Sequence, residues 1–139
     1  MNRALLDTDT LSEIGKGKNS TVIANANAYR QVFGRYSFSV ITVLEIVRGY
    51  QSAQQLQRLL AFLASIPSEE VISLDVAAAE LAGRITGDLD RTGQPIGRAD
   101  PMIAAVAIQK GLELVTGNTA HYQRIQQLGY PLTLANWRT

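Results

Sequence analysis

Two kinds of hydrophobic pattern alternate along this chain. Short apolar or β-branched runs predict strands, and stretches whose apolar residues recur every three or four positions predict helices. The expected strands are residues 4–6, 36–42, 70–74, 112–116 and 131–134. The expected helices fall within residues 8–14, 20–33, 43–50, 56–63, 81–89, 101–109 and 118–128. Strands that alternate with helices predict an α/β fold with a mainly parallel central sheet.

Two of the expected helices differ in how their apolar residues are distributed. PMIAAVAIQ at 101–109 is apolar on all sides and should be buried. The helix at 56–63 has leucines at helical spacing, at positions 56, 59, 60 and 63, and Pro67 ends it. We expect this leucine face, like GYPL at 129–132, to pack in the core, with a contact surface as the alternative.

The composition limits the chemistry that the chain can perform. With 139 residues, 46% of them hydrophobic and 18% charged, residues 1–139 are expected to form one globular domain. The net charge of +1 neither requires nor excludes a nucleic-acid partner. The chain has no cysteine and a single histidine, His121, so thiolate and multi-histidine zinc sites are excluded and oxygen ligands for Mg²⁺ or Mn²⁺ remain. No signal peptide or membrane span is recognisable, so we expect a cytoplasmic protein without a membrane partner.

Polar side chains occur where several of the expected strands end. Asp7 follows the first strand, Glu45 lies just after the second, and Asn118 follows the strand at 112–116. Asp100 begins the helix that leads into that strand. Ligands of parallel sheets bind beyond the carboxyl ends of the strands, so one edge of the sheet should collect all four side chains.

Each of these residues also has a purely structural interpretation. Asp7 or Asp9 could cap the first helix, and Asn118 could belong to a turn. Asp100 followed by Pro101 is a common helix start, with aspartate at the N-cap and proline at the first helical position. Taken alone, Asp100 favours the cap.

Glu45 is less easily explained as a structural residue. It lies in the apolar stretch VLEIV, and an exposed ion pair with Arg48 would contribute only roughly 0.3 to 0.5 kcal/mol. Three carboxylates gathered at one edge would repel one another by about 4 kcal/mol per close pair. A divalent cation removes that cost, and acidic oxygens holding Mg²⁺ are the usual means of hydrolysing phosphodiesters with an activated water.

Several segments together resemble the PIN-domain nucleases and, within them, the VapC-like toxins of bacterial toxin–antitoxin pairs. The matching segments are ALLDTDTLSE at 4–13, SVITVLEIVRG at 39–49, GQPIGRADPMIAAVAI at 93–108, LVTGNTAHYQRI at 114–125 and LANW at 134–137. The resemblance implies a three-layer α/β/α domain. It also implies a Mg²⁺-dependent endoribonuclease that cleaves single-stranded RNA and forms a homodimer, with a cognate antitoxin as its inhibitor.

The resemblance also implies roles for individual residues. Asp7 and Asp100 correspond to the principal Mg²⁺ ligands, and Glu45 to the third acid. Asn118 stands where many PIN domains have a fourth acid, which makes a two-metal mechanism less certain. The hydroxyls of Thr8 and Thr116 would support these ligands.

The neighbouring residues are expected to have mostly structural roles. Asp9 stands where the toxin branch often has asparagine. It either partly restores the charge that Asn118 lacks or caps the helix, and we favour the cap. The candidate phosphate contacts are Arg98 and the lysines at 16 and 18, and for the lysines we favour solvated charge instead. We expect His121 to be exposed on its helix, with contact to the substrate as the alternative. Tyr122, Leu128 and Trp137 are expected in the core or an interface.

Two other functions remain open from the sequence. LLDTDT also matches the DxDxT pattern of haloacid-dehalogenase-type phosphatases, in which Asp7 would be the nucleophile and Asp9 the general acid/base. That reading has only Lys110 as its lysine and leaves Glu45 and Asp100 unused. The second alternative is a non-catalytic PIN domain that binds RNA or a partner, although clustered carboxylates would weaken RNA binding.

Overall fold

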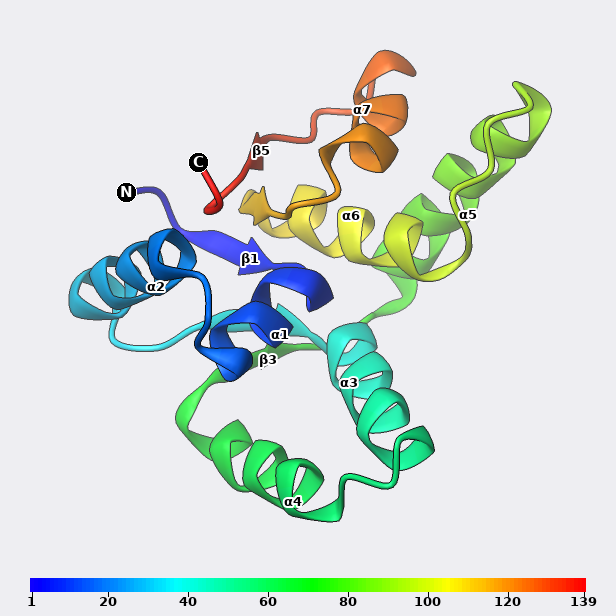
Figure 1. Cartoon of the computed structure of the whole chain (residues 1–139). Helices are drawn as coiled ribbons and strands as arrows, with labels where there is room; N and C mark the ends of the chain where they lie inside the picture. Colours follow the sequence, from blue (N-terminus) through cyan, green and yellow to red (C-terminus); the bar gives the residue numbers. More distant parts are fainter.

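A parallel sheet forms the centre of the molecule, and helices pack around it in the computed structural model of residues 1–139 (Figure 1). Its strands are β1 (Ala4–Leu6), β2 (Ser37–Ser39), β3 (Glu70–Ile72), β4 (Glu113–Val115) and β5 (Leu134–Ala135). Hydrogen bonds join them in the orders β1-β4-β5 and β2-β3, all in parallel register, and β2 lies beside β1. The expected mainly parallel sheet is therefore confirmed.

Seven α-helices connect and cover the strands. They are α1 (Thr8–Lys16), α2 (Ser20–Phe33), α3 (Val40–Ser52), α4 (Leu56–Ser65), α5 (Val76–Arg91), α6 (Ala99–Lys110) and α7 (Thr119–Gln127), and a short 3₁₀ helix (Ile66–Ser68) follows α4. None of these helices is both long enough and apolar enough to cross a bilayer.

The two central strands send alternate side chains into two separate hydrophobic cores. Leu5 and Leu114 belong to the core that α5, α6 and α7 complete. Leu6 and Val115 belong to the core on the other face, with residues of α2 and β2. Because successive side chains of a strand point to opposite faces, a sheet with both faces covered by helices results. This confirms the three-layer α/β/α arrangement.

Helix α6 is buried along most of its length, as its apolar sequence predicts. Ile103 is fully buried, and so are the four residues 104–107. The helix packs closely against α5 (Figure 1) and ends at Gly111, whose φ of 64° is the left-handed conformation that glycine adopts without strain. The first turn of α6, which carries Asp100, is thus attached to a rigid element.

The strand expected at 36–42 is shorter than its sequence indicates. The Ser39 hydroxyl accepts a hydrogen bond from the Thr42 N–H at 3.3 Å and caps α3, so Val40 and Ile41 are helical despite their β-branched or apolar character. The final strand lies at Leu134–Ala135 and not at 131–134, because Pro131 cannot donate to a ladder.

The leucine face of α4 is mostly exposed. Leu59 is 7% exposed, whereas Leu56, Leu60 and Leu63 are 62%, 55% and 42% exposed. The expected core packing is therefore wrong for this helix, since α4 lies at the periphery of the molecule, where α3 covers only one side (Figure 1). In the segment 129–132 the prediction is confirmed by Leu132, which is 6% exposed.

Candidate active site

Asp7 lies at the carboxyl end of β1 and is held on both carboxylate oxygens. Its N–H donates to the Val115 carbonyl at 2.9 Å, which extends the β1-β4 pairing by one residue. Oδ1 accepts from the Thr8 N–H at 2.8 Å, which caps α1, and Oδ2 accepts from the Thr116 hydroxyl at 2.8 Å. The residue is 5% exposed. Asp7 is thus both the helix cap and a buried acid at the sheet edge.

The surroundings of Asp7 make its negative charge unfavourable. The pKa of Asp7 is raised to about 7, first by burial, then by the charge of Asp9, with a further contribution from the charge of Asp100. Hydrogen bonds from Thr116 and Thr8 act in the opposite direction and lower it. Asp7 and Asp100 are therefore close enough to repel each other. Neither Asp7 nor Asp100 pairs with a lysine or arginine side chain, so a bound cation would supply the compensating charge.

Asp100 does not cap its helix, contrary to the expectation from the sequence. Helix α6 begins at Ala99, Arg98 occupies the N-cap position in the αR conformation, and no side chain caps this end. Asp100 lies in the first turn and Pro101 follows it there, where a negative charge interacts favourably with the helix dipole. The Asp100 oxygens are not used for capping, and the side chain faces α7 and the site.

The side chains of Asn118 and His121 extend this group from α7. Asn118 occupies the N-cap position of α7 without a side-chain cap, and its Nδ2 lies 2.8 Å from His121 Nδ1. The same Nδ1 lies 3.1 Å from Asp100 Oδ2. We expected His121 to be exposed, and its side chain is 39% exposed, but it also joins α7 to Asp100. Its spacing of three residues from Asn118 on one helix is the signal that could have indicated this.

Glu45 reaches the site region from α3. Its Oε1 accepts a hydrogen bond from the Thr8 hydroxyl at 2.5 Å, and that hydroxyl also lies 3.0 Å from the hydroxyl of Thr42. Glu45 is half-buried and makes this contact rather than the alternative ion pair with Arg48, which is exposed. Thr8, the residue that follows Asp7, therefore joins Glu45 of α3 to the start of α1.

Asp9 connects α1 to the turn after β4. Its Oδ2 accepts a hydrogen bond from the Gly117 N–H at 2.9 Å and lies 3.9 Å from a terminal nitrogen of Arg138. The expected capping role is wrong, because Asp7 caps α1 and Asp9 lies within its first turn. Arg138 was not a candidate from the sequence, since nothing in the local pattern places the penultimate residue near Asp9.

Tyr122 is fully buried and directs an unpartnered hydroxyl toward the acids. Its oxygen is the one buried side-chain polar atom of the chain without a hydrogen-bond partner. Burial, followed by the charges of Asp7 and Asp100, raises the pKa of Tyr122 well above its ordinary value. The expected burial of Tyr122 and Trp137 is confirmed, and the free hydroxyl adds a donor next to the two carboxylates.

The donor set suits a hard cation that keeps most of its water. Nowhere in residues 1–139 do three histidine or acidic side chains converge as a complete ligand set. Mg²⁺ is typically bound through one or two carboxylates with water in the other positions, so Asp7 and Asp100 fit it, and Mn²⁺ has the same ligand preference. The raised pKa of Asp7 and the unpartnered Tyr122 hydroxyl are both consistent with a cation at this place.

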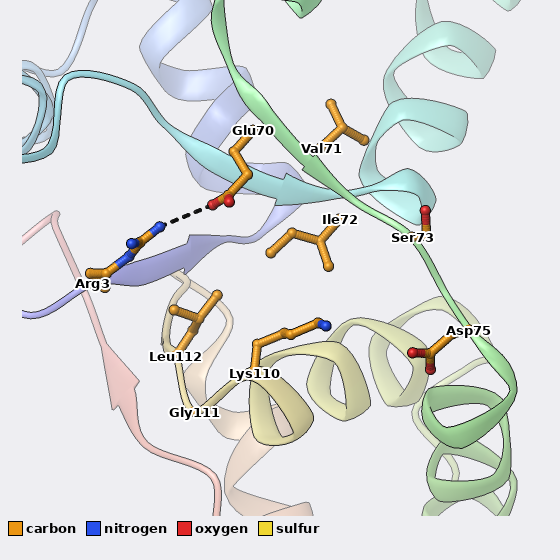
Figure 2. Close-up of a pocket in the computed structure, with 9 residues that line it drawn as sticks. All are labelled: Arg3, Glu70, Val71, Ile72, Ser73, Asp75, Lys110, Gly111 and Leu112. Atoms are coloured by element: carbon orange, nitrogen blue, oxygen red, sulfur yellow. Dashed lines mark hydrogen bonds and ion pairs between the residues drawn. The ribbon is translucent and has the colours of Figure 1, made fainter.

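A separate cavity at the other end of α6 contains none of these acids. It has a volume of about 590 Å³. The ion pair of Arg3 with Glu70, at 3.2 Å, lies on one side and Lys110 on the other (Figure 2). Lys110, which the phosphatase alternative would need beside Asp7, lines this distant cavity instead. The geometry therefore contradicts the phosphatase assignment.

Comparisons with known proteins agree with the fold. The PIN domain model matches residues 4–126. A tRNA(fMet)-specific endonuclease VapC of Shigella flexneri is 33% identical over 126 residues, which are 90% of this chain and 93% of that protein. Ribonuclease VapC2 of Haemophilus influenzae is 30% identical over 139 residues, with 99% of each protein covered. The crystal structure of DNA-bound VapBC from Salmonella typhimurium has a TM-score of 0.81 and 30% identity, and the match covers 99% of both chains.

The chain belongs to the PIN-domain family. Its similarity to VapC endonucleases and ribonucleases over nearly the full length confirms the expected class of enzyme, a VapC-like nuclease that hydrolyses phosphodiester bonds. Nucleases of this family generally depend on a divalent metal.

Proposed function

We propose that this chain is the endoribonuclease toxin of a toxin–antitoxin pair, that residues 1–139 form one nuclease domain, and that it cleaves single-stranded RNA with Asp7, Glu45, Asp100 and Asn118. The main support is that Asp7 and Asp100 come from elements far apart in the sequence and lie close enough for each other's charge to matter. A protein that only needed to fold would gain nothing from holding the Asp7 carboxylate at 5% exposure within reach of the charges of Asp9 and Asp100.

Asp7 and Asp100 are the proposed Mg²⁺ ligands, and Mn²⁺ is the expected substitute. When bound, the ion would neutralise charge on the scissile phosphate and activate the attacking water. Glu45, which accepts a hydrogen bond from the Thr8 hydroxyl, would act as the general base. Asn118 contributes a neutral hydrogen-bonding group where a fourth carboxylate would add repulsion. In-line attack leaves 5′-phosphate and 3′-hydroxyl ends.

A cavity next to Glu45 has the charges that an RNA backbone requires. It has a volume of about 350 Å³ between α1 and α3, and its lining includes Thr8, Glu45, Lys16 and Arg58. The two basic side chains face the cavity that contains the catalytic acid, so phosphates that flank the scissile bond could bind them. Lys16 is exposed, as expected from the sequence. A contact with phosphate would give this residue a role in RNA binding.

The proposed protein partners are a cognate antitoxin and a second copy of the chain. The similar Salmonella typhimurium structure is a VapBC complex with DNA. The exposed leucines of α4, and Leu44 of α3 at 60% exposure, are apolar side chains of the kind that protein partners cover. A small DNA-binding antitoxin encoded next to this gene should relieve the growth arrest that the toxin causes in the cytoplasm, and light scattering should give the mass of a dimer.

The central experiment compares wild type with Asp7→Asn and Asp100→Asn on single-stranded RNA across a range of Mg²⁺ concentrations. Asp90→Asn is the matched control, because Asp90 is an exposed aspartate on α5. We expect cleavage by wild type and the control, its loss in EDTA, and a decrease of at least about 100-fold in both site variants. RNA binding that persists in EDTA without cleavage at any Mg²⁺ or Mn²⁺ concentration would instead indicate the non-catalytic binding protein.

A further inference from the structure

Trp137 and Arg138 attach the C-terminal end of the chain to residues near the site. Trp137 is 6% exposed, packs against Tyr29 with ring centroids 5.6 Å apart, and its carbonyl accepts from the Asn25 side chain at 2.9 Å. The next residue, Arg138, is therefore held in place although it is next to last in the sequence. Its N–H also donates to Asn136 Oδ1 at 2.9 Å.

The Arg138 guanidinium lies between α1 and the turn that follows β4. Nε donates to Glu13 Oε2 at 3.0 Å, and one terminal nitrogen lies 2.9 Å from Glu13 Oε1 and 3.9 Å from Asp9 Oδ2. Two-point pairing of this kind fixes the plane of a guanidinium, which a lysine cannot reproduce. The group is thus oriented by Glu13 and presented to Asp9.

Gly117 leaves the space that this guanidinium occupies. A β-carbon built on Gly117 would overlap the terminal atoms of Arg138. Gly117 does not have a positive φ, so its backbone conformation by itself does not require glycine. The missing side chain is therefore explained by the close approach of Arg138 and not by the turn geometry.

The contacts continue from Gly117 to Asp7. The Gly117 N–H donates to Asp9, the Asn118 N–H donates to the Thr116 hydroxyl at 3.0 Å, and that hydroxyl donates to Asp7 Oδ2 at 2.8 Å. Any movement of the Gly117–Asn118 turn would change the hydrogen bond that orients Asp7.

We propose that Arg138 is a positioning residue of the nuclease site, which holds the Gly117–Asn118 turn against α1 through Asp9 and thereby keeps Thr116 and Asn118 in place beside Asp7. This inference rests on the proposed function for its catalytic consequence. Its structural part concerns the geometry of the Asp7 ligand and can be measured without RNA.

The test uses the full chain with Arg138→Ala, Arg138→Lys, Gly117→Ala and the double variant Gly117→Ala/Arg138→Ala. Gly117→Ala displaces the guanidinium while leaving arginine in the sequence, so it should reproduce the effect of Arg138→Ala. Arg84→Ala is the control, because Arg84 also pairs with a glutamate, at 2.9 Å, but on the exposed surface of α5. Calorimetry measures Mn²⁺ binding to each metal-free protein, and cleavage of single-stranded RNA gives kcat and KM.

We expect Arg138→Ala and Gly117→Ala each to weaken Mn²⁺ binding by about tenfold, at the low end of effects seen for groups that orient metal ligands. They should lower kcat with little change in KM. The double variant should bind Mn²⁺ no more weakly than either single variant, because the two substitutions remove the same contact. Arg138→Lys should also bind Mn²⁺ more weakly than wild type. Arg84→Ala should bind Mn²⁺ and cleave RNA like wild type.

Three results would overturn the proposal. Tighter Mn²⁺ binding by Arg138→Ala would mean that the arginine acts only as a positive charge that opposes metal binding. Full activity of Arg138→Lys would likewise mean that the positive charge, and not the guanidinium geometry, is what matters. An increase in KM alone would mean that Arg138 binds RNA directly. If Gly117→Ala does not fold, the two Arg138 variants still decide between these outcomes. Failure of wild type to cleave RNA would refute the proposed function, while the Mn²⁺ affinities would still decide the role of Arg138.

Discussion

Replacing Asp7 with asparagine should stabilise the metal-free protein at alkaline pH. In the folded chain Asp7 keeps its proton up to a pKa of about 7, against 3.8 for an ordinary aspartate. The folded state therefore binds more protons than the unfolded state between these values, so stability is full below about pH 4 and is lost as pH rises through 7. A difference of about three units at about 1.4 kcal/mol each gives a cost near 4 kcal/mol for the fully ionised residue.

Asparagine removes this charge and keeps most of the local hydrogen bonding. Its carbonyl oxygen can still accept from the Thr8 N–H that caps α1, and the Thr116 hydroxyl can rotate to accept from the new amide. Some hydrogen-bond strength is lost in the exchange, because the acceptor is no longer charged. We therefore expect a net gain of about 2 to 4 kcal/mol in unfolding free energy at pH 8.

Urea unfolding in EDTA at pH 4 and pH 8 measures this effect. At pH 8 Asp7→Asn should unfold at higher urea than wild type, and at pH 4 the two should unfold at similar concentrations. Mg²⁺ should stabilise wild type and leave the variant unchanged, since binding to the folded state alone raises stability. Asp90→Asn should show none of these differences. If Asp7→Asn is less stable than wild type at pH 8, or differs equally at both pH values, the reasoning about a charge held without compensation is refuted.

Three further substitutions test separate parts of the structure. Tyr122→Phe removes a buried hydroxyl without a partner, so unfolding in EDTA should require about 1 kcal/mol more free energy, and a clear loss of stability would reveal a hydrogen bond there. Ile103→Ala opens a cavity where the side chain is fully buried in α6 and should cost about 2 to 5 kcal/mol in urea unfolding; a cost below about 1 kcal/mol would contradict the view of α6 as a rigid support. Glu45→Gln should reduce RNA cleavage by about 100-fold or more while the melting temperature stays within a few degrees of wild type, and undiminished cleavage would remove Glu45 from the mechanism.

Local pattern was sufficient for the elements whose chemistry is contained in their own residues. The apolar sequence of 101–109 required burial, and Ile103 is fully buried. The short run ALL followed by Asp7 indicated a strand that ends at a polar edge, and β1 ends at Leu6. Local pattern was misleading where a single hydrogen bond decides the boundary, as at Ser39, whose hydroxyl starts a helix within residues that favour strands.

The sequence by itself determined the parallel α/β architecture and the presence of acidic residues at the end of β1, in the helix after β2 and at the start of α6. Strand ends and helix starts follow from nearest neighbours in the chain. Only the tertiary structure decided what these residues contact. Asp7 rather than Asp9 caps α1, Asp100 faces His121, and Arg138 lies over Gly117. The contact between Asp100 and His121 and the contact between Gly117 and Arg138 each join residues 21 positions apart. Their geometry depends on how the sheet brings distant segments together, which no local pattern of residues encodes.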